Sequence, residues 1–198
     1  KDVGFKPGEF SYIGMTAKAV GTILVPKNSP YKSLEEFVAA AKANPGKLTT
    51  AGVGSTGAAH HAEITEILGI ETTYVPVSGG VGKMMPMLQG NHVDAGITSS
   101  THAVRHAATV DPIVTAGDDT AIAGIPNEPG WGYTTTWGVM APPGTPADRI
   151  AILNAALNKV TADPQFKANV EKVGLRQLRM TPEEAKAYVE AAVKKYSK

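Results

Sequence analysis

The sequence predicts an α/β fold in which parallel strands alternate with helices. Short apolar segments recur along the first half of the chain, and a helical pattern separates each from the next. A polar capping residue also indicates the start of several helices, and in places proline follows it directly. Strands that are joined by helices run in the same direction with right-handed crossovers, so we expect a parallel sheet.

The first elements carry clear start and stop signals. Segment 21–26 (GTILVP) is predicted to be a strand that ends at its proline. Ser33 then starts a helix with a capping box, because Glu36 follows three residues later. Asn-Pro-Gly at 44–46 ends this helix.

Strand and helix continue to alternate up to residue 116. The helices that follow are expected to run to about Leu68, to the vicinity of Gly90, and across His102 and His106. The expected strands are 48–51, 72–75, 93–97 and 113–115.

The pattern changes after residue 116. Segment 117–135 is rich in Gly, Pro, Asp and Thr, which predicts an ordered loop, and the apolar segment 137–141 predicts a strand. Three later helices share one start signal, a polar cap followed by proline at the first helical position. The pairs are Thr145-Pro146, Asp163-Pro164 and Thr181-Pro182, and Glu184 completes a capping box in the last.

The composition excludes several classes of protein. The chain has 198 residues, of which 42% are apolar and 19% charged, and its formal net charge is +1, so neither disorder nor a nucleic-acid surface is indicated. It contains no cysteine, which excludes disulfides and thiolate metal sites. Its apolar stretches are far shorter than the roughly 20 residues that span a bilayer. No signal peptide is recognisable in it.

Three strand-to-helix junctions carry the functional signal. They are GVGSTG at 52–57, VSGG at 77–80 and TSST at 98–101, each built from small and hydroxyl residues. In a parallel sheet these junctions lie at one edge, where ligands of open α/β folds bind. The free N–H groups and dipoles of the helix starts would face one anion, without a lysine or arginine.

We therefore predict a receptor for a small anion, without catalytic residues, cofactor or metal. Val77 would shape the pocket wall, and the other predicted site residues would supply hydrogen-bond donors. The donors are Gly54, Ser55, Thr56, Gly57, Ser78, Gly79, Thr98 and Ser99.

A nucleotide-dependent enzyme is the main alternative. Segment 52–57 matches the dinucleotide fingerprint GxGxxG between a strand and a helix. The fingerprint also needs an acidic residue at the end of the next strand, but that strand runs into Val75-Pro76 and the nearest acid, Glu71, precedes it. No Lys-Ser/Thr pair follows the glycines, which excludes a Walker loop. A purely structural or partner-docking domain is the third possibility.

The histidines could suggest a metal site and Ser55 a catalytic nucleophile, but the sequence pattern supports neither. His102 and His106 are four residues apart on a predicted helix, but no Glu-x-x-His motif or cysteine completes a metal site around any histidine. Ser55 is not in a G-x-S-x-G elbow, so a nucleophile is not indicated. The methionines of 84–87 are expected in a helix core.

The ordered motifs resemble a known family, the Bug or TctC-type receptors of tripartite tricarboxylate transporters. The similarity extends over essentially the whole chain in the family's order and spacing. It is carried by 33–37 (SLEEF), 41–48 (AKANPGKL), the loop ending at Ser55 with histidine beyond it, Val75-Pro76 with Gly79-Gly80, 88–90 (LQG), 93–96 (VDAG), Trp137-Gly138, 141–146 (APPGTP), Leu153-Asn154, Asp163-Pro164 and 181–184 (TPEE).

The resemblance implies a monomeric, periplasmic, clamshell protein that delivers a carboxylate, aliphatic or aromatic, to a membrane transporter. Crossovers near Val25-Pro26 and Asp111-Pro112 would make residues 27–112 one lobe, and 1–26 with 113–198 the other. In relatives, amides, hydroxyls and ordered water of βα loops hold the carboxylate.

The chain also departs from the family pattern. Relatives begin with a further strand–helix region with a first glycine-rich ligand loop, so a missing N-terminal segment of the same protein is an expected partner. Val77 stands where relatives often have an aromatic residue. Either His60 or His61 matches the family histidine, because the segment between Ser55 and the histidines is longer than usual.

Overall fold

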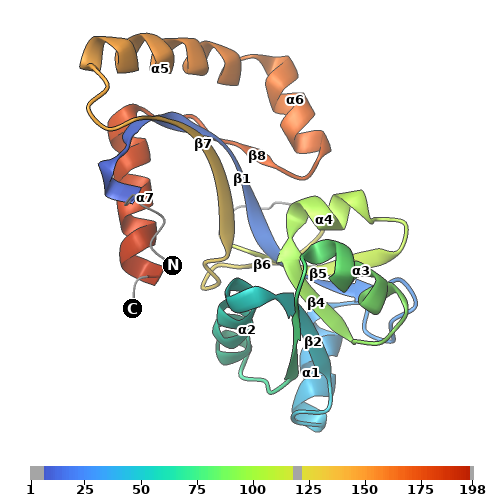
Figure 1. The fold of residues 1–198 in the computed structure, drawn as a ribbon. Coiled ribbons are helices and arrows are strands. Elements are labelled where there is room, and N and C mark those ends of the chain that lie inside the picture. The colour runs from blue at the N-terminus through green and yellow to red at the C-terminus, as the bar shows by residue number, and fades with distance from the viewer. Residues whose placement is uncertain (1–6, 118–121, 197–198) are drawn as a thin grey trace. The chain divides into compact units, whose positions relative to one another are not determined.

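The computed structural model describes residues 7–117 and 122–196. It has the predicted mixed α/β architecture (Figure 1). The chain forms two compact units. Unit 1 consists of Lys1–Lys18, Thr136–Lys172 and Arg176–Lys198, and unit 2 of Ala19–Thr135 and Val173–Leu175.

The elements follow the predicted alternation through most of the chain. The strands are β1 (Ser11–Pro26), β2 (Thr49–Val53), β3 (Thr73–Val77), β4 (Ala95–Ser99), β5 (Val110–Ala116), β6 (Asn127–Glu128), β7 (Thr134–Ala141) and β8 (Arg176–Gln177). The helices are the 3-10 turn η1 (Pro7–Glu9), α1 (Leu34–Ala43), α2 (Gly54–Leu68), α3 (Val81–Gln89), α4 (Ser100–Arg105), α5 (Ala147–Thr161), α6 (Pro164–Lys172) and α7 (Pro182–Tyr196).

Unit 2 is built on a sheet with the strand order β3-β2-β4-β1-β5-β6. β2 pairs in parallel with both β3 and β4, and β5 pairs in parallel with β6. β1 runs antiparallel to β4 and to β5. Every strand of this sheet except β1 therefore has its carboxyl end at the same edge.

Helices cover both faces of the unit 2 sheet, and Figure 1 shows α2 on one side of the strands with α3 and α4 on the other. On the first side, Phe37 of α1 and Ile64 of α2 are buried in one apolar cluster. On the other, Met84 and Leu88 of α3 are fully buried in a second cluster. The methionines of α3 thus belong to the core, as predicted. This layered packing fixes where each helix starts relative to the strand that precedes it.

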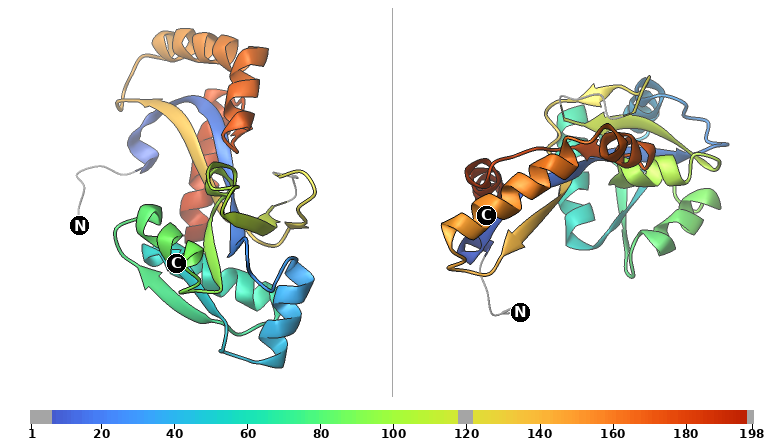
Figure 2. Two further views of the ribbon diagram at one scale, coloured as in Figure 1. Left: turned by 90° about the vertical axis from the view of Figure 1, so that its right-hand side faces the viewer. Right: turned by 90° about the horizontal axis from the view of Figure 1, so that it is seen from above.

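Unit 1 contains the remaining helices. β7 and β8 each pair with β1, and Tyr12 and Met15 of β1 are buried in a cluster with Ala185 of α7. The side chain of Asn154, on α5, donates a 2.6 Å hydrogen bond to the carbonyl of Ile13. Figure 2 shows α5 leading into α6, both in orange.

Ser33 and Thr181 cap their helices as predicted, but only Thr181 forms a complete capping box, because the Glu36 carboxylate accepts from the Lys32 amide rather than from that of Ser33. The Ser33 hydroxyl accepts from the amide of Glu36 at 3.2 Å, and the Thr181 hydroxyl accepts from the amide of Glu184 at 3.2 Å. The Glu184 carboxylate in turn accepts from the Thr181 amide at 2.8 Å. Each cap satisfies an N–H group that a helix start would otherwise leave unpaired.

Of the two remaining proline-marked starts, one is confirmed and one is wrong. The Asp163 carboxylate caps α6 by accepting from the Gln165 amide at 2.8 Å. Thr145 does not cap α5, because its hydroxyl donates to the carbonyl of Pro142 at 2.8 Å. Pro146 is the N-cap residue there, and no side chain caps the helix.

Three further expectations about the elements are corrected. β1 begins at Ser11 rather than at residue 21, and it is antiparallel to β4 and β5. The two-residue strand β6 lies within the predicted loop 117–135, of which residues 118–121 fall outside the described residues. Helix α2 starts at Gly54, so the last four residues of the glycine segment are helical rather than a loop.

The predicted lobes and the two compact units have different boundaries. Segments 19–26 and 113–135, predicted to belong to the first lobe, lie in unit 2. Contact-based units do not define how a molecule closes around a ligand, so the lobe division stays a prediction. In the described residues, no helix combines the length and hydrophobicity that crossing a bilayer requires.

Candidate functional site

The carboxyl ends of β2, β3 and β4 are level with one another. Val53, the last residue of β2, pairs with Val77, the last residue of β3. On the other side of β2, Gly52 pairs with Ile97 of β4, which places Thr98 level with Val53. The turns that follow these strands therefore begin at one edge, as the sequence predicted.

The helices that follow these strand ends have no side-chain caps. The N-cap residues are Val53 for α2, Gly80 for α3 and Ser99 for α4, and none accepts a capping hydrogen bond through its side chain. The first N–H groups of a helix have no partner within it. α2 and α3 thus present unpaired amides and the positive end of the helix dipole at this edge.

Most of the predicted donors of the first two turns are exposed, as their predicted role requires. These residues are Gly54, Ser55, Thr56, Ser78 and Gly79. Gly54 and Gly79 have φ angles of 60° and 93°. A side chain at either position would strain the backbone, so these turns depend on glycine.

Gly57 and Val77 have structural positions. A Cβ atom on Gly57 would lie 2.7 Å from the carbonyl carbon of Gly52 and 2.8 Å from the Tyr74 hydroxyl oxygen. The last glycine of the GxGxxG segment therefore permits close packing of α2 on β2. Val77 is buried in the cluster beneath α3. Its role as a pocket wall stays a prediction.

Thr98 and Ser99 are buried and bonded within the protein. The Thr98 hydroxyl is 3.0 Å from Nδ1 of His102, and the Ser99 hydroxyl is 2.7 Å from that of Thr101. Ser99 is also 3.2 Å from the same histidine nitrogen. Burial lowers the pKa of His102, and the positive charges of Arg105 and His106 lower it further. A neutral imidazole can accept from these hydroxyls.

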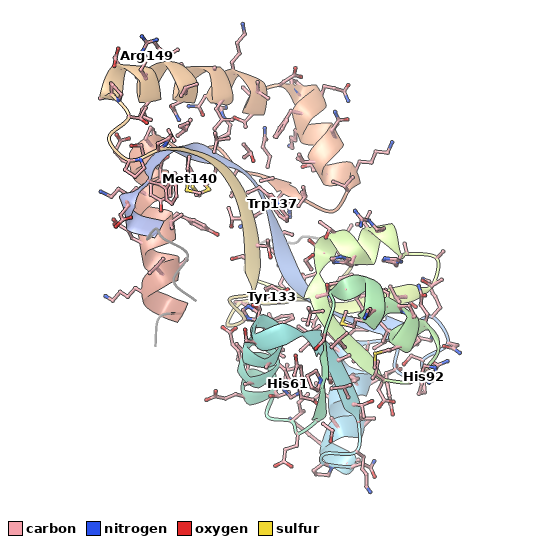
Figure 3. The ribbon with its side chains drawn as sticks, viewed as in Figure 1. His61, His92, Tyr133, Trp137, Met140 and Arg149 are labelled. Atoms are coloured by element: carbon pink, nitrogen blue, oxygen red, sulfur yellow. The ribbon has the colours of Figure 1, made fainter. Side chains whose placement is uncertain are left out.

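His60 and His61 lie in the second turn of α2, away from its first residues. His60 is buried, and its Nδ1 is 3.0 Å from the Glu63 carboxylate. His61 is partly buried, which lowers its pKa, and its Nε2 is 2.8 Å from the Thr72 hydroxyl. Figure 3 marks His61 on α2 and the exposed His92 after α3. No cluster of three or more potential metal ligands occurs among the described side chains.

Two nearby residues were not singled out from the sequence. Lys83 lies in the first turn of α3, and its Nζ is 3.3 Å from the position that a Cβ atom would take on Gly79. Tyr74 donates a 3.2 Å hydrogen bond to the carbonyl of Gly54 and supports the start of α2. Burial raises the pKa of Tyr74. The sequence could have indicated Lys83, because it follows the turn residue Gly79 by four positions. Residues in the first turn of a helix lie close to the preceding turn.

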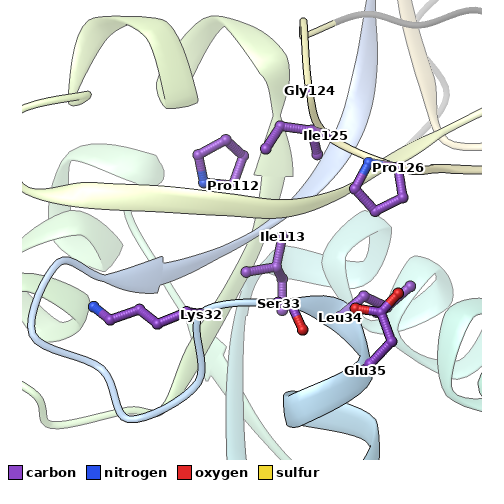
Figure 4. Close-up of a pocket in the computed structure, with 9 residues that line it drawn as sticks. All are labelled: Lys32, Ser33, Leu34, Glu35, Pro112, Ile113, Gly124, Ile125 and Pro126. Carbon is purple, nitrogen blue, oxygen red and sulfur yellow. The ribbon is translucent and has the colours of Figure 1, made fainter.

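A separate pocket of about 590 Å³ lies at the start of α1, and Figure 4 shows its lining. Lys32, Ser33 and Glu35 line it on one side, and Ile113 and Pro126 on the other. Backbone hydrogen bonding, and then the Ser33 hydroxyl, lower the pKa of Glu35, which keeps it ionised. Because the helix start is capped by Ser33 and carries this negative charge, the pocket is unsuited to an anion.

The curated relatives belong to one group of proteins. The chain is 26% identical over 182 residues to a UPF0065 protein of Cupriavidus necator, a match that covers 87% of this chain and 55% of the relative. A second UPF0065 protein, from Pseudomonas sp. (strain P51), is 26% identical over 187 residues, with 88% and 55% covered. The chain thus spans about half the length of the curated relatives it matches.

Solved structures share the fold. An R. palustris protein with adipate superimposes with a TM-score of 0.82 at 21% identity, over 100% of this chain and 70% of that one. The periplasmic binding protein BugD gives 0.78 at 24% identity, over 100% and 70%. MatC from Rhodopseudomonas palustris with bound malate gives 0.76 at 22% identity, over 98% and 71%.

The family assignment rests on the sequence as a whole. Residues 1–198 match the tripartite tricarboxylate transporter family receptor, TctC. The strand ends and helix starts described above therefore lie in a fold that this family and the solved binding proteins share. The chain belongs to the TctC family of solute-binding receptors.

Proposed function

We propose that the chain is the ligand-binding part of a periplasmic receptor that captures a small organic carboxylate and delivers it to a membrane transporter of the tripartite tricarboxylate type. The observation that carries the proposal is the level end of β2 and β3, with the uncapped starts of α2 and α3 directly beyond it. Unpaired amides at helix starts bind anions without requiring a charged side chain. No chemical step is part of this function.

The available donors are sufficient for useful affinity. Micromolar binding requires about 8 kcal/mol. A hydrogen bond to a charged group contributes about 1.5–3 kcal/mol, and a helix start adds about 0.3–1 kcal/mol, up to about 2 when it is partly buried. Amides from the first turns of α2 and α3, with the exposed hydroxyls of Ser55, Thr56 and Ser78, reach this total.

Lys83 supports an anionic ligand further. A cation in the first turn of a helix is unfavourable, because it lies at the positive end of the helix dipole. Lys83 nonetheless occupies this position in α3, whose first turn has no acidic residue. No ion pair joins Lys83 to a described residue. A carboxylate between its ammonium group and the amides of α3 would relieve both positive charges.

Two solved structures with the same fold support one class of carboxylate ligand. Adipate and malate, each bound by one of them, are aliphatic dicarboxylates. We therefore place aliphatic dicarboxylates before tricarboxylates and aromatic acids. The nucleotide-dependent alternative loses support, because β3, the strand that follows the glycine segment, has no acidic residue at its end to hold a ribose.

Isothermal titration calorimetry tests the function directly. We expect a panel with adipate, malate, citrate and benzoate to contain a ligand with a micromolar Kd, and NAD and NADP not to bind. Ser55→Asp places a carboxylate in the first turn of α2, where it stabilises the helix dipole and repels an anionic ligand. We expect this variant to fold at least as stably as the wild type and to lose carboxylate binding.

Ala39→Asp is the matched control. It adds the same charge at an exposed position in the middle of α1, away from the strand ends, so it should bind like the wild type. Two results would contradict the proposal. One is that no carboxylate of the panel binds below millimolar concentration, and the other is that Ser55→Asp binds as tightly as Ala39→Asp.

We also infer that unit 1 packs against the part of the receptor chain that these 198 residues do not span. Helix α5 has a single buried residue, Thr161. Successive helical residues are 100° apart, so Asn154 and Thr161 lie on the side of α5 that contacts the rest of unit 1. An apolar stripe lies roughly opposite that side. The exposed stripe residues are Ile152, Leu153, Ala156 and Val160. Apolar patches of this kind indicate an interface.

The length of the relatives supports this partner. Solved relatives align over all of this chain but have 30% of their own length beyond it. β7 adds a strand with exposed Trp137 and Val139 to the same unit, and Figure 3 labels Trp137 on it. A strand-and-helix segment could pair with β7 and cover α5.

Co-elution tests this partner. The probe is the segment of the Cupriavidus necator relative that the alignment leaves uncovered. We expect it to co-elute with the chain in size-exclusion chromatography, and Leu153→Lys to prevent this. Ala155→Lys, on the exposed polar side of α5, should not. Failure to co-elute, or self-association that Leu153→Lys abolishes, would contradict the inference.

A further inference from the structure

Tyr133 lies at the strand-end edge of the unit 2 sheet, although it is far from the glycine turns in sequence. In the antiparallel ladder of β1 and β4, Gly21 pairs with Ser99, the last residue of β4. The Gly21 amide donates a 2.7 Å hydrogen bond to the Tyr133 carbonyl. The tyrosine ring covers Gly21 so closely that a Cβ atom there would lie 2.5 Å from ring carbon Cδ1. Register and packing together place the ring at this edge.

The ring is held firmly on both sides. It stacks on the imidazole of His60 with 3.9 Å between centroids and 7° between planes, which joins it to α2. Trp131 meets it edge-on with centroids 6.0 Å apart. The Glu63 carboxylate holds His60 at 3.0 Å and accepts from the Gly132 amide at 3.1 Å. A side chain locked in this way loses little conformational entropy when it contacts a ligand.

The hydroxyl group of Tyr133 has no hydrogen-bond partner among the described residues. The hydroxyl of Tyr74 at the same edge, in contrast, donates to Gly54. The Tyr133 side chain is partly buried, and burial raises its pKa. It therefore remains protonated at neutral pH and keeps its O–H donor.

We propose that Tyr133 contacts the bound carboxylate, with its hydroxyl donating to a ligand oxygen and its ring forming a fixed wall of the site. The proposal rests on the function proposed above and adds a contact that comes from neither a glycine turn nor a helix start. The close packing on Gly21 and the stack on His60 act as positioning contacts. A shift of the ring would carry the donor away from the ligand.

The test compares Tyr133→Phe with the wild type, using the tightest-binding carboxylate of the calorimetric panel as the probe. Phenylalanine keeps the ring packing, so the urea midpoint should stay unchanged. Loss of one hydrogen bond to a charged oxygen should raise Kd about 10- to 100-fold. Gly21→Ala keeps the hydroxyl but displaces the ring, so it should also raise Kd. Tyr31→Phe is the matched control, because Tyr31 packs on Phe37 of α1 and lies in a different part of the sheet layer.

The outcomes separate this inference from the function on which it rests. A raised Kd for Tyr133→Phe and Gly21→Ala, with Tyr31→Phe at the wild-type value, supports it. Wild-type affinity in Tyr133→Phe shows the contact to be wrong and leaves the receptor function intact. Absence of any carboxylate binding by the wild type refutes both.

Discussion

Gly57→Ala is the substitution whose effect follows most directly from the structure. Position 57 lies in the first turns of α2, where alanine normally stabilises a helix over glycine by about 0.5–1 kcal/mol. The new methyl group would lie 2.7 Å from the carbonyl carbon and 3.0 Å from the Cα atom of Gly52, and 2.8 Å from the Tyr74 hydroxyl oxygen. Carbon atoms in good contact are about 3.5–4.0 Å apart. The helix and the strand must therefore separate.

The strand cannot yield, so the helix start must move. β2 is paired with β3 on one side and β4 on the other, which fixes the backbone of Gly52. Overpacking of this kind costs about 1–3 kcal/mol. The helix-propensity gain offsets part of it, and we expect a net loss of stability of about 1–2 kcal/mol. The displaced start of α2 should also raise the Kd for the carboxylate ligand.

Urea denaturation followed by circular dichroism measures the stability effect. Gly82→Ala in α3 is the matched control, because it is also a helical glycine but nothing lies within 4 Å of the position that a Cβ atom would take there. We expect this control to be more stable than the wild type by about 0.4–1 kcal/mol. If Gly57→Ala proves as stable as Gly82→Ala, the close approach of α2 to β2 is not as described.

Three further predictions concern a cap, a histidine and a lysine. Thr181→Ala should lower unit 1 stability by about 1 kcal/mol, and Thr145→Ala by less than about 0.5 kcal/mol, in urea titrations, because only Thr181 caps a helix. The lowered pKa of His102 means that the unfolded chain binds the proton more tightly, so stability is complete above about pH 6.5 and falls as the pH drops toward the folded-state pKa. His102→Gln should reduce this loss between about pH 7.5 and 5.5, as urea titrations at a series of pH values would show. Lys83→Met should raise the Kd of a dicarboxylate in calorimetry and weaken its dependence on salt, and an unchanged salt dependence would remove this lysine from the site.

The parts of the fold that the sequence predicts well depend on local signals. Ser33, Asp163 and Thr181 cap their helices because the capping hydrogen bond joins residues two or three apart, which the sequence displays. Thr145 has the same signature but bonds backward to Pro142. The signature therefore identifies a residue that can cap, while the path of the preceding turn decides whether it does.

Long-range pairing explains what could not be predicted. The direction of β1 depends on its insertion between β4 and β5, which are far from it in sequence. The candidate site shows the same difference between local signals and long-range contacts. The glycine turns were predicted because each follows its own strand, but Tyr133 reaches the edge only through its packing on Gly21. The hydroxyls of Thr98 and Ser99 were predicted to face a ligand, and only the structure reveals their bonds to His102 and Thr101.

Several locally unfavourable features occur together at this edge of the sheet, and their combination is an argument for binding. Helix α7 has a complete capping box and the Ser33 side chain caps α1, whereas α2 and α3 have no side-chain cap. Such a missing cap costs a helix about 1 kcal/mol. Gly54, Gly79 and Gly80 adopt positive φ angles there, and Lys83 adds a positive charge where the dipole is already positive. Proteins tolerate local inconsistencies of this kind chiefly at functional sites. A negatively charged ligand would satisfy the amides and the charge together, which an uncharged ligand could not do.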